Sequence, residues 1–266
     1  MTVRDNRRCD KNAPGGNHAF EGRTISSPAS HRRTHEGHVL WHNRRMVRVS
    51  VTVSLAVTSL WLATAAAQAP QDAHDMHRLH DDPKAYIQAL EDPARDAYQK
   101  PHEVMTALGV TTGEVIADIG SGSGYFTLRL AHHVGDTGHV YGVDVSPEMV
   151  RYLNERIRDA GLPNITTILA RPDDPLLPRS VDRFLIVDVW HHIEDQAGYL
   201  AKIKARLKAG GQVVMIDFHK RDLPVGPPAA MKIAREDVVA QMETHGFRLV
   251  REHTFLPYQY FLVFGI

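Results

Sequence analysis

Cysteine is nearly absent from this sequence: among its 266 residues there is a single one, Cys9. An internal disulfide needs two cysteines, and a thiolate metal site or a cysteine nucleophile needs at least one. Every residue after Cys9 lies in a cysteine-free chain. Disulfide frameworks, thiolate metal sites and cysteine catalysis are therefore excluded for everything that follows it, which is compatible with an oxidising compartment.

An excess of basic charge is also missing from most of the chain. The formal net charge of +0 divides into +5 for residues 1–45 and −6 from Pro70 onward. A domain with a net charge of −6 has no basic field that would attract phosphate groups. We therefore expect no nucleic acid as a partner.

Charged residues are absent from residues 49–67, where Arg44, Arg45 and Arg48 come before and small residues follow. This order is typical of a secretory signal, so residues 46–69 are interpreted as a signal peptide cleaved after Ala67 or Ala69. The alternatives are an uncleaved N-terminal anchor and a buried helix. A signal or an anchor predicts an exported domain facing the periplasm, with membrane contact only through residues 46–69. If the segment is not a working signal, the protein is cytoplasmic.

The flanking segments are polar. Residues 1–45 lack the apolar periodicity of a folded domain and are interpreted as disordered or as the product of a misassigned start, in which case translation begins at Met46. The alternative is a long twin-arginine leader. Residues 70–100 are predicted to form a polar linker and a short helix. They contain His74, His77 and His80, which could bind a metal or simply belong to a solvated linker.

From residue 101 to 266, helical and strand patterns alternate. The expected strands are 114–120, 138–145, 164–170, 183–190, 210–218, 247–256 and 258–266, and helices lie between most of them. This order predicts one α/β domain: a Rossmann-like, seven-stranded, mostly parallel sheet with helices on both faces. The last two strands are too close for a crossover helix, so they must form an antiparallel hairpin.

A glycine-rich turn follows the first strand in "VIADIGSGSGYF", with Gly120, Gly122 and Gly124 spaced two apart. Glycine permits positive φ and close approach of a ligand, and the following helix offers free N–H groups. A dinucleotide site would need a third glycine at the position of Tyr125. Asp118, two residues before the loop, would repel a pyrophosphate and suits a cationic ligand. A second acid, Asp144, ends the next strand, where a carboxylate can bind ribose hydroxyls.

At this point the chain resembles the class I S-adenosylmethionine-dependent methyltransferases, and more narrowly a poorly characterised group of exported bacterial proteins. The resemblance rests on "VIADIGSGSGYF", "VYGVDVSPEM", "LPRSVDRFLIVDVWHHIED" and "LKAGGQVVMIDF", and it runs from about His102 to the C-terminus. In the last motif, Ala209 replaces the usual proline. The resemblance implies a cofactor, S-adenosyl-L-methionine.

It also implies site residues. Asp118 and the backbone of the loop would hold the methionine portion of the cofactor, Asp144 the ribose, and Val145 would pack beside the adenine. The acid near the adenine amino group would be Asp173 or Asp174. The loop residues concerned are Gly120, Ser121, Gly122 and Gly124.

The acceptor should lie beyond the carboxyl ends of the strands. Strand 183–190 leads to Asp188, His191 and His192, and histidine is a suitable general base near neutral pH. If the two histidines alternate as in a strand, only one faces the acceptor; we favour His192, and either could instead pack or cap a helix. Asp188, Asp217 and His219 could also converge on a divalent metal, although buried structural roles are the simpler interpretation and no metal is expected.

Three functions remain from the sequence alone. The first is an S-adenosylmethionine-dependent methyltransferase acting on a small molecule, at oxygen. The second is a catalytically silent, exported protein that binds the cofactor, because S-adenosylmethionine is made in the cytoplasm. The third is a dinucleotide-dependent oxidoreductase, against which Tyr125 argues.

Overall fold

The structure, a computed structural model, describes residues 82–266. The expectations for residues 1–45, for the signal-like segment 46–69 and for His74, His77 and His80 lie outside the described residues. The helices are α2 (Pro83–Leu90), α3 (Arg95–Gln99), α4 (Pro101–Leu108), α5 (Thr127–Val134), α6 (Pro147–Ala160), α7 (Gln196–Arg206) and α8 (Arg235–Thr244), with short 3-10 turns at Trp190–His192 and Ala229–Met231. Between residues 82 and 266, no helix is long and apolar enough to cross a membrane.

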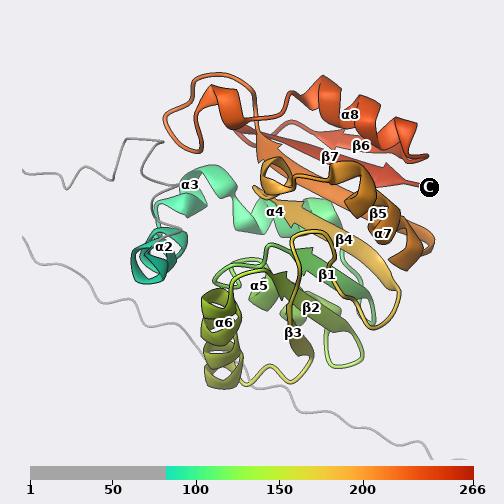
Figure 1. Cartoon of the computed structure of the whole chain (residues 1–266). Coiled ribbons are helices and arrows are strands. Elements are labelled where there is room, and N and C mark those ends of the chain that lie inside the picture. The colour runs from blue at the N-terminus through green and yellow to red at the C-terminus, as the bar shows by residue number, and fades with distance from the viewer. Residues whose placement is uncertain (1–81) are drawn as a thin grey trace, which may run out of the picture. The chain divides into compact units, whose positions relative to one another are not determined.

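The strands form one seven-stranded sheet in the order β3-β2-β1-β4-β5-β7-β6 (Figure 1). Their bounds are β1 Val115–Ile119, β2 His139–Asp144, β3 Ile165–Leu169, β4 Val181–Val187, β5 Leu207–Phe218, β6 Arg248–His253 and β7 Gln259–Gly265. The first five strands in this order are parallel, and β7 lies antiparallel between β5 and β6. The predicted mostly parallel sheet with an antiparallel C-terminal hairpin is confirmed.

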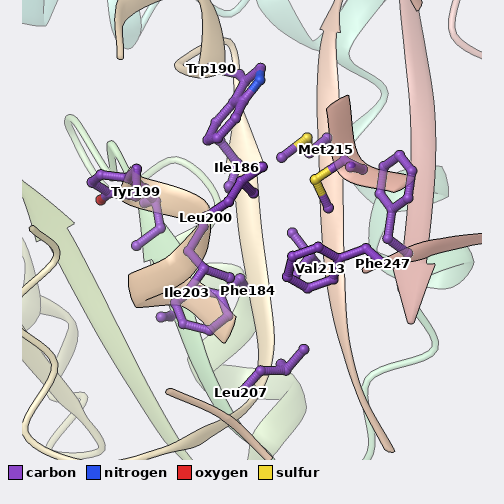
Figure 2. Close-up of a cluster of buried hydrophobic side chains, with 14 of the residues drawn as sticks. Phe184, Ile186, Trp190, Tyr199, Leu200, Ile203, Leu207, Val213, Met215 and Phe247 are labelled. Atoms are coloured by element: carbon purple, nitrogen blue, oxygen red, sulfur yellow. The ribbon is translucent and has the colours of Figure 1, made fainter. Parts of the chain in front are cut away.

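Helices cover both faces of the sheet and create two apolar cores. One core joins the sheet to α7 and α8, through residues such as Leu200 and Met242; Figure 2 shows part of it. The other joins the opposite face to α4 and α5, through residues such as Val104 and Leu130. The all-buried pattern of β1 follows from this double cover, since a strand between two cores has no solvent-facing side.

Local signals set several element ends. Ser146 caps α6 by accepting a hydrogen bond from the Met149 N–H at 3.3 Å, Pro147 takes the first helical position, and Gly161 ends the helix at φ 64°. Strand β5 begins at Leu207, earlier than expected. The reason is an irregularity in its pairing with β4, where Val181 pairs with Leu207 and Arg183 with Gln212, and Gly210 at φ 74° absorbs the extra residues.

Candidate functional site

The glycine loop lies between β1 and α5. All three glycines have positive φ: 68° at Gly120, 52° at Gly122 and 88° at Gly124. The N–H groups of Gly120 and Ser121 both donate to the Val143 carbonyl oxygen, at 2.8 and 3.0 Å. The loop is therefore held against the end of β2, at the carboxyl edge of the sheet.

At two of these glycines a side chain would force a neighbouring side chain to move. A Cβ on Gly120 would overlap the side chain of Val189, and one on Gly124 would overlap Leu153. Glycine is thus required here for space as well as for backbone conformation. The loop can bring its backbone close to a ligand because its own side chains do not intervene.

Asp144 ends β2 and is 9% exposed. One carboxylate oxygen accepts from the Gly122 N–H at 2.8 Å, and the other accepts from the Ser146 N–H at 2.9 Å. These two bonds fix the carboxylate between the glycine loop and the start of α6. The structure thus brings together the loop and the acid that the sequence pairs.

Asp118 lies beneath the loop and is 3% exposed. Its carboxylate accepts a hydrogen bond of 2.6 Å from the Thr127 hydroxyl. Burial raises the pKa of Asp118 to about 7, and the nearby Asp144 charge adds to the shift. A cation placed beside this carboxyl would favour its charged form.

A cavity of about 120 Å³ opens beside the loop. Four residues singled out in the sequence line it: Gly120, Asp144, Val145 and His192. The remaining lining residues are Ile119, Val143, Ala170, Arg171, Pro172, Val189, Ile193 and Tyr199. Its walls are mostly apolar, with the Asp144 carboxylate at one side, an arrangement common in small-molecule sites.

Asp173 lies outside this lining. Its carboxylate accepts from Lys202 Nζ at 3.0 Å, and its side chain is 60% exposed. The Lys202 hydrogen bond lowers its pKa. Asp174 accepts from the Leu176 N–H at 2.8 Å and so shapes the same turn.

Asp188 follows β4 in the left-handed region, at φ 57°. Both its oxygens accept from Gln259 Nε2, at 2.7 and 2.9 Å. Burial and the Asp217 charge raise the pKa of Asp188 to about 7. A non-glycine residue held in this conformation is a strained position of the kind that accumulates at functional sites.

His191 and His192 do not alternate as in a strand, because they lie in the 3-10 turn Trp190–His192. The assumption of alternation is therefore wrong.

His191 is buried, and its Nδ1 lies 2.9 and 3.0 Å from the two oxygens of Asp217. Burial lowers the pKa of His191, but the Asp217 hydrogen bond and charge outweigh it, so the pKa is raised. The ring centre of His192 lies 4.1 Å from that of His191, and His192 lines the cavity.

No metal cluster forms among residues 82–266, because no three His, Asp or Glu side chains converge there in a suitable arrangement. The predicted alternative of Asp188, Asp217 and His219 as a metal site finds no support in this geometry.

The segment before the main domain also reaches the site, which the sequence did not reveal. Leu90 lies against the glycine loop, 3.1 Å from where a Cβ on Gly122 would stand. Glu91 pairs with Arg156 at 2.6 Å, and Tyr125 donates a hydrogen bond to Asp96. The only sequence feature that hinted at these contacts is Tyr125, which stands where a dinucleotide site has a glycine. Nothing in the sequence pointed to Gln99, which is fully buried near Asp188 and Gln259.

Comparisons with known proteins identify the family of the chain and the fold. A family model described as "Methyltransferase domain" matches residues 111–251. The demethylmenaquinone methyltransferase of Tropheryma whipplei is 35% identical over 112 residues, 42% of this chain and 44% of that protein. The enzyme of the same name from Listeria welshimeri is 28% identical over 123 residues, 46% of this chain and 52% of that protein. The chain thus spans about half the length of the curated relatives it matches.

A solved structure is similar over more of the chain. The SAM-dependent methyltransferase from Aquifex aeolicus superposes with a TM-score of 0.65 at 27% identity, covering 69% of this chain and 97% of that one. The magnesium protoporphyrin IX methyltransferase from Synechocystis, solved with bound SAH, shares the fold at 17% identity and a TM-score of 0.54, covering 73% of this chain and 99% of that one.

Proposed function

We propose, because this chain belongs to the family of methyltransferase domains, that it transfers a methyl group from S-adenosylmethionine to an oxygen of a small-molecule acceptor. The observation that carries this proposal is the Asp144 carboxylate, fixed by the glycine loop beside an apolar cavity. When bound, S-adenosylmethionine supplies a methyl group on a positively charged sulfonium.

The residues present fit this cofactor. The loop offers backbone that a Cβ would obstruct, and the buried hydroxyls of Ser121 and Ser123 lack hydrogen-bond partners within the described chain. A buried hydroxyl without a partner is costly unless a ligand satisfies it. Both features favour a polar ligand lying along residues 120–124.

Each side of the cavity then has a role. Asp144 accepts hydrogen bonds from the ribose hydroxyls, while Val145 packs against the adenine. Asp118 lies under the loop and favours the cationic methionine end electrostatically. Asp173 binds Lys202 outside the cavity and has no role in this proposal.

The acceptor lies beside Asp188, and that carboxylate takes the proton of the acceptor hydroxyl. A base with a pKa of about 7 is matched to proton transfer near neutral pH. His191, held by Asp217, is the second proton acceptor beside it, and the two groups influence each other's charge. His192 lines the cavity next to Val189 and positions the cofactor there.

The test is a methyl-transfer assay on a broad panel of hydroxylated small molecules, with S-adenosylhomocysteine release as the readout. Activity should rise with pH through about 7 as Asp188 ionises. Asp188→Asn should lower kcat by 10²-fold or more, roughly the contribution of a general base, and remove this rise. Full activity in the variant would contradict the role of Asp188.

The signal-like segment supports a second candidate, a silent exported protein that binds the cofactor without turnover. We propose that residues 46–69 direct export, on the strength of the arginines, the uncharged run and the small residues after it. A reporter fused after Ala69 tests this: periplasmic activity is expected, and activity only in the cytoplasm would refute export. Cofactor binding without transfer to any acceptor would favour the silent protein.

A further inference from the structure

Two buried glutamines beside Asp188 carry polar atoms without partners. Gln99 at the end of α3 is 0% exposed, and Gln259 at the start of β7 is 1% exposed. Within residues 82–266, Gln99 Nε2 and Gln259 Oε1 have no hydrogen-bond partner. An unpaired amide group in the interior costs about 1–3 kcal/mol. Two of them next to a carboxyl indicate a ligand that would pair them.

The hydrogen bonds determine which atoms are left over. Gln259 Nε2 donates to both oxygens of Asp188, at 2.7 and 2.9 Å, and lies 3.4 Å from Gln99 Oε1. In the ionised form that acts as a base, the Asp188 carboxylate only accepts hydrogen bonds, so the amide nitrogen of Gln259 faces it. The oxygen of Gln259 is then a free acceptor. Because the amide oxygen of Gln99 accepts from Gln259 Nε2, the amide nitrogen of Gln99 is left as a free donor.

Three aromatic residues lie next to these glutamines along the chain or across the sheet, and their rings are close to one another. The ring of Tyr98, the neighbour of Gln99, has its centre 6.2 Å from those of Phe218 and Tyr258. Tyr258 precedes Gln259, and Phe218 pairs with Gln259 across β5 and β7. Aromatic rings at such distances pack favourably against another flat ring. The environment therefore favours a planar, conjugated molecule.

We propose that Gln99, Gln259 and Asp188 form the acceptor subsite for a planar ring with two neighbouring hydroxyl groups, one of them acidic. This inference rests on the proposed function. In it, the O–H bond of the acidic hydroxyl breaks and its proton moves to an Asp188 oxygen. The resulting ring oxygen accepts from Gln99 Nε2, and the second hydroxyl donates to Gln259 Oε1.

The strength of the base supports an acidic hydroxyl. Because the pKa of Asp188 is raised to about 7, its carboxylate is better matched to the proton of a phenol, whose pKa is about 10, than to that of an aliphatic alcohol. Polar and charged groups on several helices and strands face Asp188 and influence its charge. These groups are Arg95, His191, Asp217, Gln259, Tyr86, Tyr98 and Tyr260.

The ligand must displace part of α3 to enter, since Gln99 and Gln259 are both buried. Lys100, which joins α3 to α4, is held at φ 43°, a strained conformation for a lysine. The subsite is complete when α3 is docked.

Equilibrium binding to the full chain tests the proposal without cofactor or turnover. The probe is 4-nitrocatechol, whose visible absorption reports ionisation of its hydroxyl, and the control is 4-nitroanisole, a similar ring without a free hydroxyl. We expect 4-nitrocatechol to bind about tenfold or more tightly than the control, with a spectral change on binding. Equal affinity for the two molecules would overturn the proposal.

A matched pair of variants locates the site. Gln99→Leu should weaken 4-nitrocatechol binding about tenfold and leave 4-nitroanisole binding unchanged. Gln212→Leu, the same change in the middle of β5, where Gln212 pairs with Gly265 of β7, should alter neither. Unchanged probe binding in a folded Gln99→Leu protein would overturn the proposal. A wild-type protein that binds S-adenosylmethionine but not 4-nitrocatechol would overturn this inference alone; one that binds the probe but not S-adenosylmethionine would overturn the proposed function.

Discussion

At the scale of single residues, the two neighbouring acids Asp144 and Asp118 lie in different environments. Asp144 has both oxygens bound by backbone N–H groups, and it borders the cavity. Asp118 is more deeply buried, and its pKa is raised to about 7. The first is arranged to accept hydrogen bonds, whereas the second favours a nearby positive charge. A ligand with ribose hydroxyls and a cationic end matches both.

Asp144→Ala should weaken S-adenosylmethionine binding about 10- to 150-fold, because hydrogen bonds to a charged group contribute about 1.5–3 kcal/mol. Calorimetric titration of the full chain measures this. Asp159→Ala, which removes an exposed carboxylate at the end of α6, is the control and should bind normally. Unchanged affinity in Asp144→Ala would refute the ribose role.

Gly120→Ala and Gly161→Ala form a second comparison. Both glycines are left-handed, at φ 68° and 64°, so an alanine costs each about 1–2 kcal/mol in backbone strain. Only at Gly120 does the new methyl group also overlap Val189, in the cavity wall. Thermal unfolding should therefore show a larger loss of stability for Gly120→Ala, with weaker cofactor binding. Equal losses of stability in the two variants would show that a methyl group at Gly120 fits beside Val189 without a clash.

At the scale of elements, Tyr125 links α3 to α5. Its hydroxyl donates to Asp96, and the guanidinium groups of Arg95 and Arg129 lie 4.4 and 4.3 Å from its ring centre. Together with Glu91–Arg156, this contact holds the segment 83–99 over the glycine loop. The tyrosine that argues against a dinucleotide site thus helps to hold the segment 83–99 in place.

Removing this link should loosen the segment. Tyr125→Ala loses one hydrogen bond and two cation–π contacts, together about 1–3 kcal/mol, so amide exchange in residues 83–99 should speed up roughly 5- to 150-fold. Tyr125→Phe keeps the ring and should show a smaller effect. Exchange at the wild-type rate in both variants would show that the segment is held by other contacts.

The sequence predicts elements better than it predicts their contacts. Helix α6 could be delimited from Ser146, Pro147 and Gly161, since caps act within a few residues. The contact between Gln99 and Gln259 joins residues 160 positions apart, and no local pattern encodes it. The 3-10 turn at His191 was missed because a short turn after a strand has no periodicity to detect.

At the scale of the whole molecule, Asp118 and Asp188 link stability to pH. The pKa of each is raised from 3.8 to about 7 by burial. Between these values the unfolded chain has released protons that the folded protein retains, so the stability that these groups contribute falls as pH rises through about 7.

Melting temperatures at pH 5 and pH 8 test this linkage. The wild-type protein should lose stability between them through these two groups, and Asp118→Asn and Asp188→Asn should each reduce the loss and melt higher than wild type at pH 8. Asp159→Asn should not. A pH dependence identical in all four proteins would contradict buried, proton-retaining carboxyls.

The most direct test of the central claim is calorimetric titration of the full chain with S-adenosylmethionine and, separately, with NAD. The glycine loop, Asp118 and Asp144 predict saturable binding of S-adenosylmethionine that weakens as pH falls below about 7, because protonated Asp118 no longer attracts a cation. They predict no comparable binding of NAD. Binding of NAD without binding of S-adenosylmethionine would show that the loop and the two acids serve a dinucleotide instead.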